Sequence, residues 1–383
     1  MKLYIYMKLF PPDITKIKSE GTKKAIHGLA YGLVKCGVET TILCEGENDG
    51  SFEMPEGYKI RCFTNPDQNQ SFKIAIGLRQ FISQNLNSNT IVILSGIFQP
   101  RIYAVARFLK KYGIPYVVFP HDPYNPAIFS KNAHLKWTYW YIFERRILRQ
   151  ARAIQLLDSR HTEFLRNLKV NTPTIAAPNG FLPNEVYPEA SLTWNTKSTP
   201  KLFFIGRIDT HNKGLDLLID AFAKVVEITD AQLIIQGTDK GDKKNLEDRV
   251  TKLSLSNKTS FLPADYSTPT PLIIKNYDVF CVPSRFEGFS LAALEAMLAG
   301  RVLLVSEVAG IAPHVQASGC GVVVAPEVSA IKSGLIKLLE CRSDWEKMGL
   351  RGRYYALEHL DWKKIASTAI DQYQRLLEPY TKF

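Results

Sequence analysis

The sequence lacks the short motifs of several large enzyme classes. Its 383 residues contain neither G-x-G-x-x-G nor G-x-x-x-x-G-K-[ST], so there is no dinucleotide fingerprint and no P-loop. D-x-D, H-E-x-x-H and the G-x-S-x-G elbow are absent too. The six cysteines show no C-x-x-C spacing, which indicates reduced thiols of a cytosolic chain rather than a zinc site. We therefore expect neither a metal nor a bound cofactor.

Long apolar runs are also missing. The opening MKLYIYMKLFPP is too short and too often interrupted by lysine for a signal peptide, and it is better explained as a first strand. No segment approaches the roughly 20 apolar residues of a membrane span. The chain is therefore expected to be soluble or attached to a membrane from one side.

What the chain does have is size, an ordinary core composition and positive charge. A length of 383 residues predicts two domains, and 45% hydrophobic residues with 22% charged ones are typical of a globular protein. A net charge of +11 favours anionic partners, namely phosphates, nucleic acid or an anionic membrane surface.

Short apolar runs alternate with amphipathic segments, as in βαβ units around a parallel sheet. In the first half the expected strands are residues 2–6, 39–44, 90–95, 115–120 and 151–157, and the expected helices are 22–36, 72–86 and 100–112. In the second half the expected strands are 201–206, 231–237, 259–262, 278–283, 301–306 and 321–324.

The alternation breaks between the halves, at residues 181–200. This stretch has three prolines, Pro183, Pro188 and Pro200, and no clear periodicity, so it is expected to be a linker. The predicted organisation is a domain over residues 1–182, a linker over 183–199 and a second domain over 200–361. A last helix within 362–383 could belong to either half, including by packing back on the first domain.

The stretch GRIDTHNKG, residues 206–214, directly follows an expected strand. Arg207 and Lys213 bracket a turn that leads into a helix, and helix N-termini favour anions. An arginine fork and a lysine point charge both suit phosphate oxygens. On the residues alone, a phosphate site and two solvated cations in a loop are about equally good explanations.

The stretch SRFEGFSLAALEAMLAG, residues 284–300, follows another expected strand. Ser290 is a good N-cap, and the leucines after it recur at helical spacing. Glu295 then lies on the second turn of a short, largely buried helix, where a bare carboxylate is costly. It could hold the vicinal hydroxyls of a ribose or pair with a core arginine.

Two weaker elements lie in the first half. His121 and Asp122 follow a strand, so His121 could donate to a sugar or phosphate oxygen, or the pair could simply form a turn. The first βα loop, residues 19–28, holds Gly21 followed by Lys23 and Lys24 at a helix start. By itself this loop indicates little.

Together these residues resemble a retaining glycosyltransferase of family 4. GRIDTHNKGLDLLIDAF looks like the family element G-R-x-x-x-x-K-G-x-x-x-L-I-x-A-F, and PSRFEGFSLAALEAMLAG looks like P-S-x-x-E-G-F-x-x-x-x-L-E-A-M-x-x-G. APNGF, residues 177–181, matches the P-N-G that precedes the linker. The first half matches through His121-Asp122 and the basic loop, where the family commonly has paired glycines and this chain has Glu20-Gly21-Thr22.

The resemblance implies the GT-B fold, two facing Rossmann-like α/β domains with an interdomain cleft. The first domain would bind the acceptor, and the second would bind a nucleotide-sugar, a co-substrate that needs no metal. In this scheme Arg207 and Lys213 neutralise the leaving diphosphate. Glu287 hydrogen-bonds the donor sugar, and Glu295 holds the ribose hydroxyls.

The resemblance also assigns backbone contacts. Residues of the second stretch would cap sugar and phosphate, namely Gly288, Phe289, Ser290 and Leu291. Gly206 and, from the first domain, Gly21 would complete the donor site, and His121 would touch the sugar. The base would be selected around residues 263–266. The catalytic set implied is Glu287, His121, Arg207 and Lys213.

The acceptor side offers fewer clues. Residues 131–152, the basic aromatic segment, carry six basic side chains against one acidic, with five aromatics among them. Such a segment can lie on an anionic membrane surface or pack its aromatics against the sheet. No motif supports nucleic-acid binding.

The predicted function is transfer of a sugar from a UDP-, GDP- or ADP-linked donor to a glycan or glycolipid acceptor, in cell-surface polysaccharide or glycolipid biosynthesis. The predicted location is cytoplasmic, with peripheral attachment to the inner face of the plasma membrane left open. The alternatives are a non-catalytic nucleotide-sugar-binding scaffold and another GT-B enzyme such as a sugar-phosphate synthase.

Overall fold

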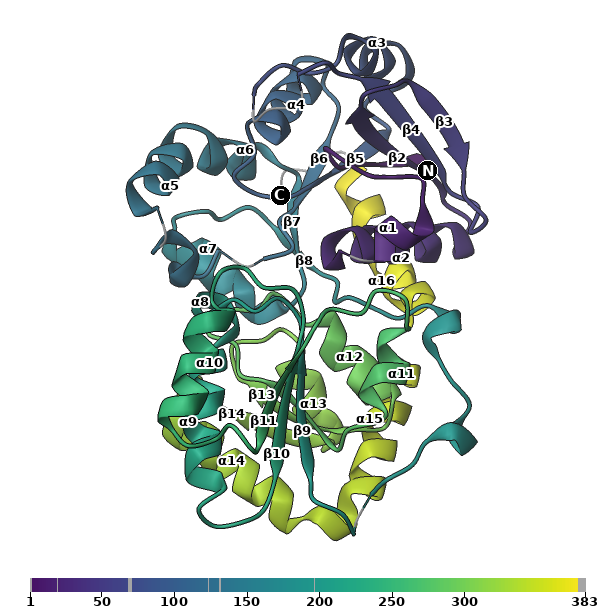
Figure 1. Ribbon diagram of the computed structural model, residues 1–383. Coiled ribbons are helices and arrows are strands. Elements are labelled where there is room, and N and C mark those ends of the chain that lie inside the picture. The colour runs from purple at the N-terminus through teal and green to yellow at the C-terminus, as the bar shows by residue number, and fades with distance from the viewer. Residues whose placement is uncertain are drawn as a thin grey trace. The chain divides into compact units, whose positions relative to one another are not determined.

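The computed structural model describes residues 2–18, 20–67, 71–122, 124–130, 132–195 and 197–377 (Figure 1). The chain forms two compact units. Unit 1 comprises the residues up to Gly180 together with those from Trp362 on, and unit 2 is Phe181–Asp361. Residues 378–383, the end of the expected last segment, lie outside the described residues, as do Lys131 of the basic aromatic segment and Thr196 of the expected linker.

Unit 1 is built around an eight-stranded sheet with the order β3-β4-β2-β1-β5-β6-β7-β8. All neighbouring strands are parallel except β3 and β4. The elements are β1 (Lys2–Tyr6), α1 (Ile14–Lys18), α2 (Gly21–Lys35), β2 (Glu39–Gly46), β3 (Gly50–Glu53), β4 (Lys59–Thr64), α3 (Ile76–Asn85), β5 (Thr90–Ser95), α4 (Pro100–Lys111), β6 (Tyr116–Phe119), α5 (Ala133–Tyr139), the π-helical turn η2 (Trp140–Glu144), α6 (Arg145–Gln150), β7 (Ala153–Leu156), α7 (Thr162–Asn167), β8 (Thr174–Ala176) and α16 (Trp362–Leu377).

Unit 2 has a six-stranded, fully parallel sheet with the order β11-β10-β9-β12-β13-β14. Helices cover both of its faces, α9, α10 and α14 on one and α11, α12 and α15 on the other (Figure 1). The elements are β9 (Lys201–Ile205), α8 (Thr210–Lys213), α9 (Leu215–Val225), β10 (Gln232–Gln236), α10 (Lys243–Lys252), β11 (Thr259–Leu262), α11 (Thr270–Ile274), β12 (Val279–Val282), α12 (Leu291–Leu298), β13 (Val302–Ser306), α13 (Ala312–Ser318), β14 (Gly321–Val324), α14 (Val328–Glu340) and α15 (Trp345–His359).

The expected parallel α/β architecture is confirmed, and every expected strand and helix is present. Three strands were not predicted, namely β3, β4 and β8. β3 is largely exposed and β8 has only three residues, so neither shows a clear apolar run. In β4, KIRCFT, the alternation is broken by Cys62 beside Phe63, which hides the period of two.

The last helix completes unit 1 by packing on α2 (Figure 1). This approach depends on Gly28, because a Cβ there would lie 2.0 Å from the indole nitrogen of Trp362. Further along α16, the buried Tyr373 hydroxyl donates to the side-chain oxygen of Gln155 on β7. The chain therefore leaves unit 1 once and returns to it, an arrangement that the sequence left open.

The basic aromatic segment is mostly packed. The Trp137 ring stacks on Phe129 at 4.2 Å, and Trp140 is buried against Tyr124 and Phe129. The side chains that remain exposed on this segment include Leu135, Tyr141 and Ile142. Packing within unit 1 thus accounts for Trp137 and Trp140 but not for these three exposed side chains.

Glu144 is buried at the end of this segment. Its Oε1 accepts a hydrogen bond from the Tyr124 hydroxyl at 2.7 Å, and the carboxylate also interacts with the backbone N–H of Phe98. Burial raises the pKa of Glu144 from 4.5 to about 7. Because the folded state holds this proton more tightly than the unfolded state, the stabilisation that the proton provides is fully present below about pH 4.5. It falls as pH rises towards 7.

Glu144→Gln removes this penalty and keeps an acceptor for Tyr124. The free energy of unfolding of Glu144→Gln minus that of wild type is therefore expected to increase by about 3 kcal/mol from pH 4 to pH 8. Denaturant unfolding at both pH values measures the gain, and Glu163→Gln, on an exposed position of α7, is the matched control. A gap between Glu144→Gln and wild type that is independent of pH would contradict the buried titration.

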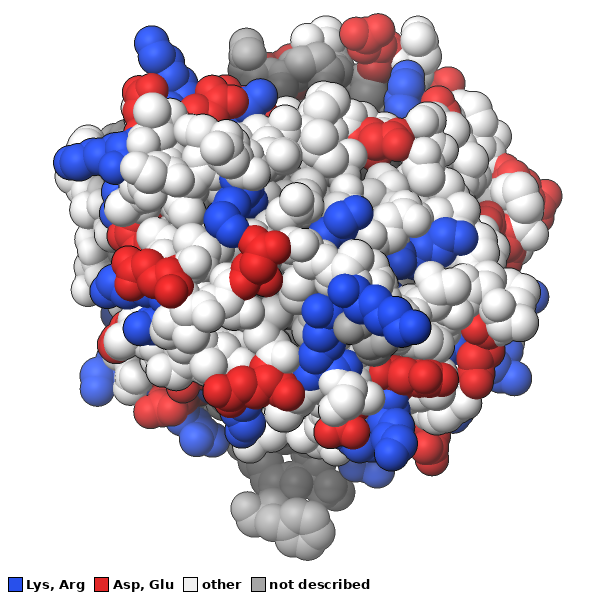
Figure 2. All heavy atoms as spheres, turned by 60° about the horizontal axis from the view of Figure 1, so that its bottom comes forward, with Lys and Arg blue, Asp and Glu red and all other residues white. Residues whose placement is uncertain are grey.

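Basic and acidic side chains are interspersed on the face of unit 2 that Figure 2 presents. The excess of positive charge in the sequence is not gathered there into one basic surface. In the described part of the chain, no helix is long and apolar enough to cross a membrane.

Candidate active site

The two motif-bearing loops of unit 2 lie next to each other because of the strand order. The chain runs outward from β9 to β10 and β11, then returns to β12 on the other side of β9. Ligands of open α/β sheets bind at such a reversal, outside the carboxyl ends of the strands. The loop after β9, residues 206–214, and the loop after β12, residues 283–290, both start at this point.

Lys213 is placed by the short helix α8. Asp209 caps this helix, with its carboxylate accepting from the backbone N–H of Asn212 at 3.2 Å and from its side-chain amide at 2.7 Å. The next residue, Gly214, has φ +63°, and a Cβ there would lie 2.3 Å from the carbonyl oxygen of Pro283. Only glycine combines this conformation with this contact, so the two loops touch directly.

Lys213 and Glu287 meet although they are 74 residues apart in the sequence. The Lys213 ammonium forms an ion pair with Oε2 of Glu287, and the Ser284 hydroxyl donates to the same oxygen at 3.3 Å. Both charged side chains are largely buried, with exposed fractions of 16% and 14%. The cation therefore holds the carboxylate in a fixed place at the carboxyl ends of β9 and β12.

A second set of contacts fastens the loops together. The Arg285 guanidinium makes two 2.7 Å bonds to the Asp216 carboxylate and one 3.0 Å bond to the Thr210 carbonyl. The backbone N–H groups of Arg285 and Phe286 donate to the carbonyl of Asn212. None of these residues belongs to a pattern that can be recognised in the sequence. Of the residues that hold the two loops, Asp209 gives a local signal, because it is an N-cap residue type ahead of a helix.

The helix after the second loop begins as expected. Ser290 adopts φ +81°, and its hydroxyl accepts from the backbone N–H of Ala293 at 3.3 Å. Leu291 is the first residue of α12, and Phe289 is buried directly before the cap. Glu295 lies on α12 as predicted, buried to an exposed fraction of 7%. Gly288 precedes Phe289 in the same loop.

The first loop contributes Gly206 and Arg207. The Gly206 N–H donates to the Gln236 carbonyl at 3.0 Å, so the first residue of the turn after β9 is tied to the end of the neighbouring strand β10. Arg207 follows it and is exposed. The Pro263 carbonyl, in the region where the base is expected, accepts from the Gln236 side chain at 3.1 Å.

His121 and Gly21 belong to unit 1. His121 has φ +63°, its ring lies against Phe119 with centroids 3.9 Å apart, and its Nε2 is 2.9 Å from the Ser95 hydroxyl. Desolvation lowers its pKa to about 3, so the ring is neutral at physiological pH. Gly21 is the first residue of α2. Pro123, which follows the His121-Asp122 pair, lies outside the described residues.

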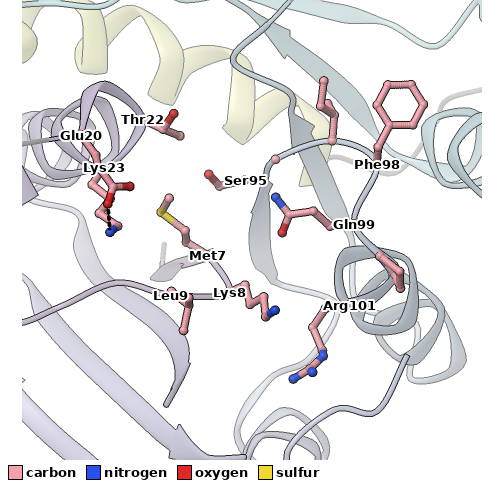
Figure 3. Close-up of a pocket in the computed structure, with 13 residues that line it drawn as sticks. Met7, Lys8, Leu9, Glu20, Thr22, Lys23, Ser95, Phe98, Gln99 and Arg101 are labelled. Carbon is pink, nitrogen blue, oxygen red and sulfur yellow. Dashed lines mark hydrogen bonds and ion pairs between the residues drawn. The ribbon is translucent and has the colours of Figure 1, made fainter. Parts of the chain in front are cut away.

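A pocket of about 480 Å³ opens in unit 1 at the carboxyl ends of β1 and β5, where the strand order reverses (Figure 3). Its walls are the segment after β1, the first turn of α2 and the loop from β5 into α4. They are formed by Met7, Lys8, Leu9, Glu20, Thr22, Lys23, Ser95, Gly96, Ile97, Phe98, Gln99, Pro100 and Arg101. In the described part of the chain, no group of three or more His, Cys, Asp or Glu side chains could hold a metal ion.

Each half of the chain matches the sequence model of a known family. Residues 192–354 match the glycosyl transferases group 1, and residues 20–180 match the glycosyl transferase 4-like domain. The first match spans both loops of unit 2, and the second spans most of unit 1.

Among curated proteins, the chain is 32% identical over 182 residues to an uncharacterized glycosyltransferase of Methanocaldococcus jannaschii, covering 46% of this chain and 45% of the relative. It is 24% identical to the MMP alpha-(1->4)-mannosyltransferase of Mycolicibacterium hassiacum, with 70% and 67% covered. It is 28% identical to a phosphatidyl-myo-inositol mannosyltransferase of Mycobacterium tuberculosis, with 54% and 55% covered. The chain thus spans about half the length of two of these three relatives.

Solved structures resemble the fold over the whole chain. Sucrose-phosphate synthase from Thermosynechococcus elongatus has a TM-score of 0.76 at 17% identity, covering 98% of both chains. Anabaena HepE, in complex with UDP and glucose, has a TM-score of 0.72 at 17% identity, covering 98% of this chain and 100% of the other.

The two parallel-sheet units with loops meeting at the strand-order reversal define a GT-B protein. With both halves matched by glycosyltransferase family models, the chain belongs to the glycosyl transferases group 1, family 4 type. The resemblance seen in the sequence is thereby confirmed at the level of family and fold.

Proposed function

We propose that the protein is a retaining, metal-independent hexosyltransferase that uses a nucleoside-diphosphate-sugar. The observation that carries the proposal is the Lys213–Glu287 pair, which two independent sets of contacts fix at the strand-order reversal of unit 2. A cation beside a carboxylate provides one group for the diphosphate and one for the sugar that it carries.

In the proposed reaction the bond between the anomeric carbon and the diphosphate oxygen breaks. The acceptor hydroxyl oxygen forms the new bond on the same face, and its proton passes to the leaving phosphate oxygen, so the configuration is retained. Negative charge then grows on the diphosphate, where Lys213 and Arg207 stabilise it. Fixed charges of this kind contribute several kcal/mol in a partly desolvated site.

The remaining donor contacts follow the family pattern. Glu287 hydrogen-bonds the sugar, and Glu295 on α12 holds the ribose hydroxyls. The backbone from Gly288 to Leu291 caps sugar and phosphate, with Gly206 and Gly21 in support. His121, neutral and oriented by Ser95, hydrogen-bonds a sugar hydroxyl rather than supplying a charge.

We propose a glycan or glycolipid acceptor that binds at unit 1, and a role in cell-surface polysaccharide or glycolipid synthesis on the cytoplasmic side. The mannosyltransferase relatives support a hexose donor. The exposed Leu135, Tyr141 and Ile142, on a segment rich in basic residues, support peripheral contact with an anionic membrane.

Donor turnover tests this function. The purified chain is incubated with chelator and a panel of UDP-, GDP- and ADP-hexoses, and release of the free nucleoside diphosphate is followed by mass spectrometry. We expect slow hydrolysis of one donor, lost in Arg207→Ala. Arg249→Ala, on the exposed face of α10, is the matched control and should retain the wild-type rate.

Three outcomes separate the alternatives. Hydrolysis that survives in Arg207→Ala would refute the phosphate role. Saturable binding of one donor without turnover, with or without any acceptor, would instead indicate the non-catalytic scaffold. Turnover that appears only when a divalent metal replaces the chelator would contradict metal independence.

A further inference from the structure

The pocket of unit 1 carries more positive than negative charge. Lys8, Lys23 and Arg101 line it, against the single carboxylate of Glu20 (Figure 3). Arg101 is neutralised by Glu45, which is buried behind it. Counting both carboxylates, three cations face two anions, so one positive charge is in excess.

The lysines enter from two different elements. Lys8 belongs to the segment after β1, and Lys23 lies on the first turn of the 15-residue helix α2. The Lys23 ammonium is 2.6 Å from Oε1 of Glu20, with exposed fractions of 15% for Lys23 and 59% for Glu20. An ammonium has three N–H donors, so Lys23 can hold this carboxylate and still bind a second anion. The positive end of α2 reinforces both lysines.

Between the charges the lining is polar and uncharged. Ser95 and Gln99 extend toward the space beside Met7, and Thr22 stands across from them on α2 (Figure 3). Ser95 is buried and is held by the His121 ring at 2.9 Å. Hydroxyl and amide groups both donate and accept, which is what binding to a ring of hydroxyls requires. A volume near 480 Å³ lies in the range of small-ligand sites.

We propose that this pocket binds a polyhydroxylated acceptor that carries an anionic group, either a free phosphorylated sugar or the phosphate-linked polyol headgroup of a lipid. Lys8 and Lys23 bind the anion, while Ser95, Thr22 and Gln99 bind the hydroxyls. The proposal rests on the proposed function in calling the ligand an acceptor, and it gives the Glu20-Gly21-Thr22 loop a role on the acceptor side.

Direct binding tests the pocket without any donor. Calorimetry compares glucose 6-phosphate, mannose 6-phosphate and myo-inositol 1-phosphate with their parent polyols. Vesicles of phosphatidylcholine with and without phosphatidylinositol are compared by flotation. The proteins are wild type, the double variant Lys8→Gln/Lys23→Gln and the single variant Lys8→Gln, with Lys35→Gln as the control. Lys35 lies at the opposite, exposed end of α2.

We expect at least one phosphorylated probe to bind about tenfold or more tightly than its parent. This preference should fall below about threefold in the double variant and persist in Lys35→Gln. Preference among the soluble probes identifies a free sugar phosphate, and preference seen only with phosphatidylinositol vesicles identifies a lipid headgroup.

Two results would overturn the proposal. One is that no phosphorylated probe, soluble or in vesicles, is preferred to its parent. The other is that the preference survives in the double variant, which would place the anion elsewhere. Neither result depends on donor hydrolysis, so this inference and the proposed function can fail separately.

Discussion

Lys213→Met is expected to lower the rate of nucleoside diphosphate release by about 100- to 1,000-fold. The ammonium lies in a partly desolvated site beside Glu287, where a fixed cation stabilises a leaving diphosphate far better than one in water. Because the charge on the leaving group grows during bond cleavage, the loss should appear mainly in kcat rather than KM.

The measurement is the initial rate of diphosphate release at saturating donor. Lys224→Met, an exposed position on α9 of the same unit, is the matched control and should stay within about twofold of wild type. Thermal unfolding of Lys213→Met establishes that any loss of rate is not a loss of fold. A rate within about threefold of wild type would remove Lys213 from the reaction.

A double variant separates two roles for this lysine. If Lys213 acts only by holding Glu287 in place, then Lys213→Met/Glu287→Gln should be no slower than Glu287→Gln. If the ammonium contacts the diphosphate directly, the double variant should be slower by about tenfold or more. We expect the second result, because Ser284 also holds the Glu287 carboxylate.

The sequence predicts the sheets well because buried parallel strands are short apolar runs between helices. The segments 90–95, 259–262 and 321–324 were expected with the bounds that β5, β11 and β14 have. The edge strand β3 is largely exposed and has no such apolar run. The return of α16 to α2 depends on a close contact at Gly28 with Trp362, which no local pattern encodes.

The candidate site, too, could be predicted from the sequence only in part. Lys213 and Glu287 were selected one by one from their loops, but their pairing follows from the position of β12 beside β9. The residues that fasten these loops, among them Arg285 and Asp216, are 69 residues apart and resemble ordinary surface charges in the sequence. A supporting role can therefore be assigned to such a side chain only after the order of the strands is known.

Arg101 is the clearest case of a residue that the sequence conceals. It stands near the start of a helix, yet its exposed fraction is 2% and it faces Glu45, 56 residues away on β2. The same carboxylate accepts from the Tyr6 hydroxyl at 3.0 Å and from the Asn65 side chain. Arg101 also donates to the carbonyls of Asp67, at 2.8 Å, and Ser71, at 3.2 Å.

Arg101→Leu is expected to lower the free energy of unfolding of unit 1 by about 3–5 kcal/mol. The substitution leaves the Glu45 carboxylate buried without its cation, which costs more than the original pair contributes. Denaturant unfolding measures the loss, and hydrogen exchange followed by mass spectrometry assigns it to unit 1. Arg107→Leu, an exposed position on the same helix, should change stability by less than about 1 kcal/mol.

Removing the carboxylate as well should restore part of this loss. In Glu45→Met/Arg101→Leu neither charge of the buried pair remains. The Tyr6 and Asn65 donors and the carbonyls of Asp67 and Ser71 lose a partner, at about 1–3 kcal/mol for each group left buried and unsatisfied. We therefore expect the double variant to be more stable than the sum of the single losses predicts, by at least about 2 kcal/mol. Additive losses would mean that the two charges do not depend on each other.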